Sequence, residues 1–404
     1  MGEVERLFVF AVWGFGMSPV ARDSGVRVGV MALEDSCRVD FAALRAERRA
    51  KVFAGMDSAG LDALILGGAG NVHYVCGARL LGRAGVLPFA PVCVVVRSTG
   101  RVHLLSTWDE GVPPEIERED LYPLSWNPSN LMRSVASIPG LGESRRIGTD
   151  GLTATSGAMI ASLASGAELV DGGAVVEACR RVKTDAEITC LEVATAISES
   201  ALSVMASALG PGVSERELLG VYSEHVARLG APVPPSESVC FVSGDSVGFR
   251  HVPSDRVVGD GELVVLAPGA LYAGYEAGLA RTVVAGSGSG GGGGGGSALA
   301  ERCVAGMDAL LGACRAGGVG ADLYRAWESL GVGPASVVLA HGLGLGAEPP
   351  VIGLGLGRDA VLEEGMVLSV QSWVVEEGIG GCLQRETLMI SGDGPVVLTR
   401  YGRS

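Results

Sequence analysis

The sequence predicts two domains in succession, an α/β domain over residues 40–177 and an α+β domain over residues 178–404. Helix and strand signals alternate in the first part of the chain, which is typical of an α/β domain. The second part opens with two long helices and continues with short strands, the order expected of an α+β domain. A chain of 404 residues has room for two or three domains, and residues 1–39 precede the first clear helix as an N-terminal extension.

Short apolar runs separated by turn residues define the elements of the first domain. We expect a helix over residues 40–56 and then a buried strand over residues 61–67. Two further strands, 90–96 and 101–105, are joined by Arg-Ser-Thr-Gly, a sequence with turn chemistry. Residues 145–177 alternate strand and helix signals and complete the domain.

Capping boxes mark the start of both long helices in the second domain. Thr184-Asp-Ala-Glu and Ser214-Glu-Arg-Glu each place a hydroxyl at the N-cap and a Glu three residues later. Apolar residues recur at helical spacing after Thr184 until Gly210-Pro ends the first helix, and the second runs to about Leu229. The strands expected after the helices are 263–266, 366–375 and 382–390.

Residues 285–297 include seven consecutive glycines, Gly290–Gly296. Such a run is flexible, and we interpret it as an expanded surface loop within the second domain. It lacks the Lys-Ser/Thr ending of a phosphate-binding loop and the strand and helix that flank one.

Composition excludes several classes of function. Hydrophobic residues make up 48% of the chain, so it is not globally disordered. The net charge is −14 and basic residues do not cluster, which argues against nucleic acid or an anionic membrane as the main partner.

Cysteine usage and the N-terminus favour a cytoplasmic protein. The nine cysteines form no Cys-x-x-Cys motif and are odd in number, so we expect reduced thiols rather than disulfides or a structural zinc site. The apolar run Leu7–Met17 is too short to span a bilayer, and its acidic leader is a poor signal peptide.

A series of motifs occurs in a fixed order along the chain. In the second domain they begin at Arg181 (RVKTDAEI), Leu209 (LGPGVSE), Arg250 (RHVPSDR), Gly269 (GALYAGY), Arg281 (RT), His341 (HGLG), Glu348 (EP), Gly365 (GMV) and Gln384 (QRET). In order and spacing they resemble the creatinase/prolidase/methionine aminopeptidase superfamily (peptidase M24), whose fold is called pita-bread. LDALIL from Leu61 and NVHYVCG from Asn71 are similar to its N-terminal domain, so the resemblance covers the chain from about Asp40.

The resemblance also locates five positions at which metalloenzymes of the superfamily hold two divalent ions with two Asp, one His and two Glu. Those positions are Ala267, Gly278, His341, Gln371 and Glu386 in this chain, so three of the five donors are missing. Two adjacent cations need bridging carboxylates, so we expect no two-metal centre and no other cofactor. A single ion held by His251, His341 and Glu386 is a minor alternative.

The resemblance identifies His251 as the catalytic histidine, a side chain whose pKa suits proton transfer near neutral pH. His341 and Glu386 are the other candidate catalytic residues, with Glu386 orienting or balancing an imidazolium. Strand alternation puts Gln384 on the same face as Glu386, and Ser369 on the same face as Gln371. The candidate substrate-binding residues are Gln371, Glu348, Tyr275, Gln384 and Arg79, with Glu276 as a further candidate at the pocket.

The function predicted on these grounds is metal-independent, creatinase-like hydrolysis of a C–N bond in a small polar substrate, as a step of specialised metabolism. Elimination, cyclisation and isomerisation stay open as reaction types. One alternative is a catalytically inactive pita-bread protein that binds or scaffolds a partner, and a second is an M24 metallopeptidase with an altered metal site. The resemblance further implies a homodimer, in which the region of Arg79 reaches toward the partner's pocket.

Overall fold

The computed structural model describes residues 39–78, 93–106, 111–125, 127–151, 153–164, 166–231, 239–244, 249–286 and 293–402. Contacts between residues divide the chain into two compact units, one containing Asp40–Arg180 and the other Arg181–Ser404. The predicted N-terminal extension and Arg79 lie outside the described residues.

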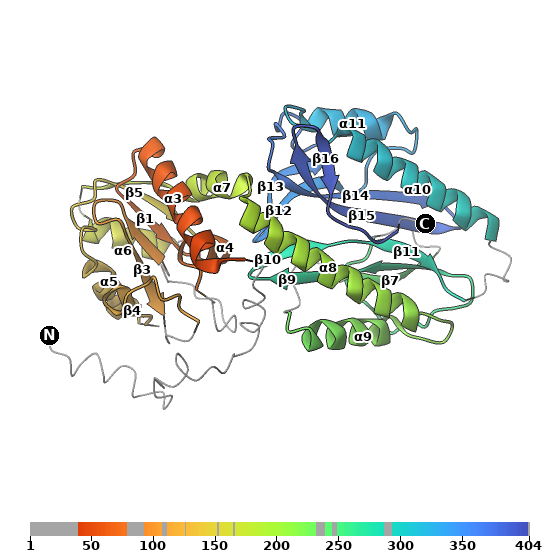
Figure 1. Ribbon diagram of the computed structural model, residues 1–404, viewed down its shortest axis with the longest axis horizontal. Helices are drawn as coiled ribbons and strands as arrows, with labels where there is room; N and C mark the ends of the chain where they lie inside the picture. Colours follow the sequence, from red (N-terminus) through yellow and green to blue (C-terminus); the bar gives the residue numbers. More distant parts are fainter. Residues whose placement is uncertain are drawn as a thin grey trace. The chain divides into compact units, whose positions relative to one another are not determined.

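The first unit is built on a six-stranded mixed sheet with the strand order β4-β3-β2-β1-β5-β6. The central strand β1 pairs antiparallel with β2 and parallel with β5, and all of its residues are buried. Ala63 and Ile65 of β1 pack with helices α5 and α6 in one apolar cluster (Figure 1). The strands are β1 Ala63–Leu66, β2 Cys93–Val96, β3 Arg101–Ser106, β4 Leu121–Pro123, β5 Arg146–Asp150 and β6 Glu168–Asp171, and the α-helices are α3 Phe41–Ala59, α4 Ala69–Cys76, α5 Pro128–Ala136, α6 Ala154–Leu163 and α7 Gly173–Arg181.

Local signals set the ends of helix α3, which confirms the predicted first helix. The Asp40 side chain accepts a hydrogen bond from the Ala43 backbone N–H at 3.0 Å. Gly60 ends the helix in the left-handed conformation, with φ of 63°. Helix α4, which begins just before the NVHYVCG motif and includes most of it, was not predicted. It follows a turn in which Asp150 accepts hydrogen bonds from the backbone of Gly67 and Gly68.

The second unit begins with the two predicted helices, α8 (Asp185–Ala208) and α9 (Glu215–Arg228), and both predicted capping boxes are present. Two antiparallel layers of strands follow, and further helices cover the second layer. These elements are β7 Val239–Ser243, β8 Leu263–Ala267, β9 Gly269–Tyr272, β10 Tyr275–Gly278, β11 Arg281–Val284, α10 Gly293–Ala313, α11 Gly320–Glu328, β12 Val338–Gly344, β13 Gly346–Gly353, β14 Val367–Glu376, β15 Gly380–Ser391 and β16 Gly394–Val397.

The strands of the second unit lie between its helices (Figure 1). One layer consists of the sheets β11-β8-β7 and β10-β9, which α8 and α9 cover. The other is the five-stranded sheet β13-β12-β14-β15-β16, against which α10 packs. Ala280 and Arg385 exchange two backbone hydrogen bonds of 3.2 Å between the layers, so the layers are joined at the middle of β15.

The structure corrects the predicted loop over residues 285–297, because helix α10 already begins at Gly293. The packing of Leu299, Cys303 and Met307 into the large apolar core explains why helix extends into a glycine-rich segment of low intrinsic propensity. Among the described residues, α8 is the one helix long and apolar enough to cross a membrane by composition. Half of its apolar window is buried inside the protein, as in a core helix.

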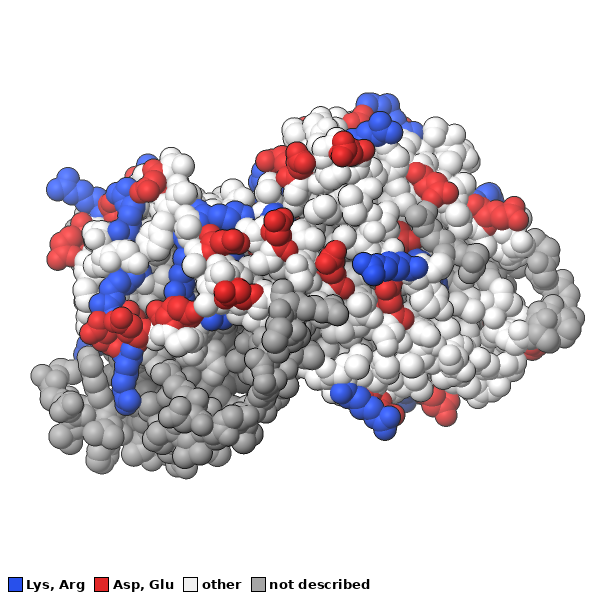
Figure 2. All heavy atoms as spheres, viewed as in Figure 1, with Lys and Arg blue, Asp and Glu red and all other residues white. Residues whose placement is uncertain are grey.

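Charged side chains of both signs are interspersed over the face drawn in Figure 2. In the first unit, for example, Arg101 pairs with Glu117, Glu119 and Asp120. The described part of this face therefore presents no broad basic surface of the kind that tracks a nucleic acid backbone.

Candidate functional site

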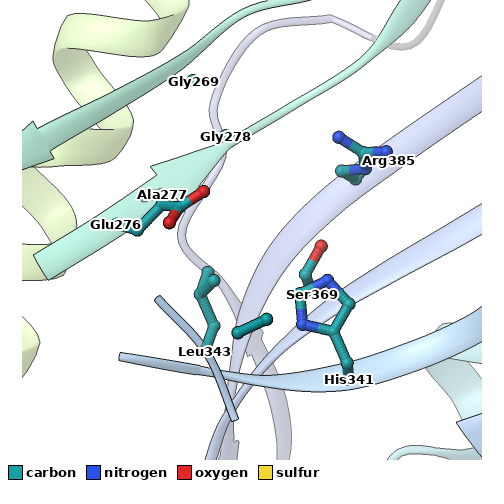
Figure 3. A pocket seen from close by; sticks show the side chains of 9 residues that line it. Gly269, Glu276, Ala277, Gly278, His341, Leu343, Ser369 and Arg385 are labelled. Carbon is teal, nitrogen blue, oxygen red and sulfur yellow. The ribbon is translucent and has the colours of Figure 1, made fainter. Parts of the chain in front are cut away.

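The candidate site is a small cavity between the two strand layers of the second unit. Its volume is about 30 Å³, enough for about two water molecules or one small polar group. Its polar side chains are Glu276 from β10, His341 from β12, Ser369 from β14 and Arg385 from β15, all drawn in Figure 3. The remaining lining residues are Gly269, Ala277, Gly278, Leu343 and Ala347.

Arg385 and Gln371 lie directly opposite each other on β15 and β14. The Gln371 side-chain oxygen accepts hydrogen bonds from Arg385 Nη2 at 2.9 Å and from Arg385 Nε at 3.2 Å. The Gln371 nitrogen donates to the carbonyl of Val338 at 2.7 Å, which fixes the orientation of the amide. A guanidinium thus lies at the position facing Gln371, and Arg385 is only 4% exposed.

This arrangement corrects the expected placement of Glu386 and Gln384. Successive side chains of a strand point to opposite faces, so Glu386 and Gln384 share the face that Arg385 does not use. The Glu386 carboxylate forms an ion pair with Arg281 at 3.0 Å and accepts a hydrogen bond from the Thr399 hydroxyl. Neither Glu386 nor Gln384 lines the cavity, whereas Arg385 of the same strand does. We therefore infer that the fifth ligand position corresponds to Arg385 rather than to Glu386.

His341 is the retained metal-ligand position that does line the cavity. Its backbone pairs with Ser369, so the two side chains are neighbours on one wall. His341 Nδ1 lies 2.9 Å from the carbonyl of Gly342, so in the neutral ring Nδ1 carries the proton and Nε2 is the acceptor nitrogen.

Ala267, the first of the five positions, is surrounded by apolar side chains. It belongs to a buried cluster with Phe241, Trp373 and Leu383. Phe249 packs edge-on against Trp373, with ring centroids 5.4 Å apart. Apolar packing therefore replaces a metal-binding carboxylate at this position.

His251 is exposed and does not line the cavity. Its ring lies 4.7 Å from the Phe249 ring, between centroids. The residues on both sides of it are fixed by Glu215, which accepts hydrogen bonds from Ser254 N–H at 2.6 Å and from the Arg250 guanidinium.

Glu215 was not identified from the sequence, although it is the first residue of helix α9 and is fully buried. Burial alone raises the pKa of its carboxyl group. Hydrogen bonds from the Val242 N–H, Arg250 and Ser254 outweigh burial, so the pKa of Glu215 lies below its ordinary value. The charged carboxylate therefore holds the segment that carries His251.

Tyr275 and Glu348 have partners away from the cavity. The Tyr275 hydroxyl donates to Glu187 at 2.7 Å, and Glu348 is paired with Lys183 at 2.9 Å, in both cases buried. The structure therefore separates these two predicted substrate-binding residues from the cavity, which the neighbouring Glu276 lines instead. Arg385 was not identified from the sequence, because its place opposite Gln371 depends on how β15 pairs with β14.

The residues present do not fit a pair of divalent cations. Ala267, Gly278, Gln371 and Arg385 occupy four of the five ligand positions, and Arg385 brings a positive charge to the site. In the described part of the chain, no three His, Cys, Asp or Glu side chains are grouped so as to hold a metal ion. The alternative single-ion site also lacks support, because Glu386 is ion-paired with Arg281 on the other face of β15.

Both halves of the chain match known families. Residues 189–391 match the profile of metallopeptidase family M24, and residues 48–182 match that of the creatinase/prolidase N-terminal domain. The Xaa-Pro dipeptidase of Pyrococcus furiosus is 27% identical over 232 residues, which are 57% of this chain and 66% of that protein. This chain thus spans slightly less than two thirds of that relative. An uncharacterized peptidase of Bacillus subtilis, YqhT, is 25% identical over 84% of this chain and 94% of its own length.

Solved structures show the same fold. The Xaa-Pro dipeptidase from Bacillus anthracis has a TM-score of 0.72 at 23% identity, and the match covers 89% of this chain and 99% of that one. The prolidase from Pyrococcus horikoshii OT3 has a TM-score of 0.73 at 22% identity, with the same coverage.

These comparisons overturn the predicted metal-independent, creatinase-like activity on a small polar substrate. The relatives named above that have an assigned activity are Xaa-Pro dipeptidases or prolidases, and the profile that matches the second unit is that of a metallopeptidase family. The alternative of an M24 metallopeptidase with an altered site agrees better with them.

The predicted superfamily and fold class are confirmed. The M24 profile covers half of the chain, and the N-terminal profile precedes it in the order that the solved structures share. This protein therefore belongs to metallopeptidase family M24, with a creatinase/prolidase-type N-terminal domain followed by a pita-bread domain.

Proposed function

We propose that this protein is a hydrolase of short peptides and that its substrates are of the Xaa-Pro type. The observation that carries the proposal is the match of both domains, in order, with Xaa-Pro dipeptidases and their fold. The cavity of about 30 Å³ admits one polar group of such a peptide, so the rest of the peptide lies outside it.

The side chains that line the cavity are available to such a substrate. His341 and Ser369 offer an imidazole and a hydroxyl to the bound group, and Glu276 and Arg385 offer opposite charges. We propose His251, on the segment fixed by Glu215, as the group that transfers a proton. No step is assigned to a metal pair, because the residues do not fit one.

Hydrolysis is tested by incubating the purified full-length protein with alanyl-proline, alone and with Mn²⁺, Co²⁺ or Zn²⁺, and measuring released proline. We expect release in at least one condition. The His251→Ala variant is expected to slow it by roughly 100-fold or more, the usual contribution of a general acid or base. Absence of release under every condition would contradict the proposed activity.

A second candidate function is binding of such peptides without cleavage. The specific observation in its favour is the replacement of the carboxylate ligands by Ala267, Gly278, Gln371 and Arg385. Titration calorimetry with alanyl-proline distinguishes the two: saturable binding without proline release supports this candidate.

We also propose that the protein is a cytoplasmic homodimer, as the resemblance implies. A dimer has twice the monomer mass of 41.1 kDa, a difference that light scattering resolves.

A further inference from the structure

The cavity is polar at two ends. Glu276 and Arg385 lie well apart in Figure 3, and Ser369 and His341 lie below Arg385 in that view. At the basic end, the charge of Arg385 is complementary to an anionic group of a ligand.

Gln371 shows how the basic end is built. Its nitrogen is engaged by the carbonyl of Val338, so its oxygen is the atom that faces Arg385. That oxygen accepts from Nε and Nη2 and so fixes the plane of the guanidinium. The amide of Gln371 is neutral, so it orients the Arg385 guanidinium but supplies no negative charge to it. A glutamate at position 371 would supply that charge.

The size and burial of the site fit one carboxylate. Arg385 is 4% exposed, and the cavity of about 30 Å³ has room for one small polar group. A buried carboxylate requires charged or hydrogen-bonding partners, and a planar guanidinium matches its two oxygens. The Ser369 hydroxyl on the same wall is a further donor.

We propose that Arg385 binds the carboxylate of a small ligand in this cavity, at a position that a metal-binding carboxylate occupies in metalloenzymes of the superfamily. The ligand class is an α-amino acid or a short peptide with a free C-terminus, whose carboxylate enters the cavity while the rest of the ligand lies outside it. This inference rests on the proposed function only for the choice of a peptide as the probe.

Calorimetry on the full-length protein, with EDTA present, tests the proposal with three probes: alanyl-proline, its C-terminal amide and free proline. We expect the amide to bind roughly 10- to 100-fold more weakly than alanyl-proline, because it lacks the charge that Arg385 recognises. Equal affinities of the peptide and its amide would overturn the proposal, and so would loss of all binding in EDTA. Free proline that binds as well as the peptide identifies the amino acid as the ligand.

Variants assign the effect to Arg385. Arg385→Met is expected to lose the preference for the free carboxylate, while Arg358→Met, a matched change at a guanidinium stacked 4.0 Å from the Tyr324 ring, keeps it. A preference that survives in folded Arg385→Met would overturn the assignment. Since the comparison of peptide and amide uses the unchanged protein, the test holds even if Arg385→Met does not fold. Binding is measured separately from proline release. The calorimetric result can therefore be interpreted even if the protein does not hydrolyse the peptide.

Discussion

Glu386→Gln is expected to lower the free energy of unfolding of the second unit by about 3–5 kcal/mol, as removal of one partner from a buried ion pair does. Glu386 is 1% exposed and its carboxylate is paired with Arg281 at 3.0 Å. The neutral amide would leave the Arg281 guanidinium with an uncompensated charge in the interior. Urea unfolding followed by far-UV circular dichroism measures the difference.

Glu328→Gln is the matched control, because Glu328 is 58% exposed and its ion pair with Arg358 is 3.6 Å long. We expect a change below about 1 kcal/mol there, as for exposed ion pairs in general. A similarly small effect at Glu386 would show that the pair with Arg281 is not structural and would return Glu386 to the candidate catalytic residues.

Glu215→Gln is expected to destabilise the protein by about 1–3 kcal/mol for each buried donor that loses its acceptor. The Val242 and Ser254 N–H groups both donate to this carboxylate, at 2.7 and 2.6 Å. Differential scanning calorimetry measures the change in Tm. Glu217→Gln on the same helix is the control, since a glutamine also completes the capping box with Ser214.

The effect of Glu215→Gln also depends on pH in a defined direction. The pKa of Glu215 is lowered in the folded protein, so its carboxylate contributes stability above the unfolded pKa, near 4.5, and loses that contribution as the pH falls through the folded pKa. The stability difference between wild type and variant is therefore largest near pH 7 and shrinks below about pH 4.5. A difference that grows on acidification would contradict the depressed pKa.

Local signals explain which parts of the fold could be predicted. The capping boxes at Thr184 and Ser214 depend on residues three positions apart, and both are present. The glycine-rich segment was predicted less well, because the start of α10 is set by core packing of Leu299 and Cys303 rather than by local propensity.

The candidate site was predicted in part. His341, Gln371 and Glu276 are at or beside the cavity, since the motifs that place them are specific. The sequence analysis expected Glu386 at the site, one residue away from Arg385, which faces the cavity. Because side chains alternate between the two faces of a strand, Glu386 lies on the other face of β15. Tyr275 was assigned to the pocket from its motif, and its hydrogen-bond partner Glu187, from a distant part of the chain, is not apparent in the sequence.

The hydrogen bonds between Ala280 and Arg385 bear on how this family changes its chemistry during evolution. They join the two strand layers through main-chain atoms alone, whereas the Gly278 carbonyl accepts a hydrogen bond from the side-chain hydroxyl of Thr387 at 2.9 Å. Arg385 thus joins the two layers through its backbone, while its side chain lines the cavity. Mutations there can exchange carboxylates for glycine or arginine while the backbone scaffold stays intact, so an ancestral centre can be rewritten without being unfolded.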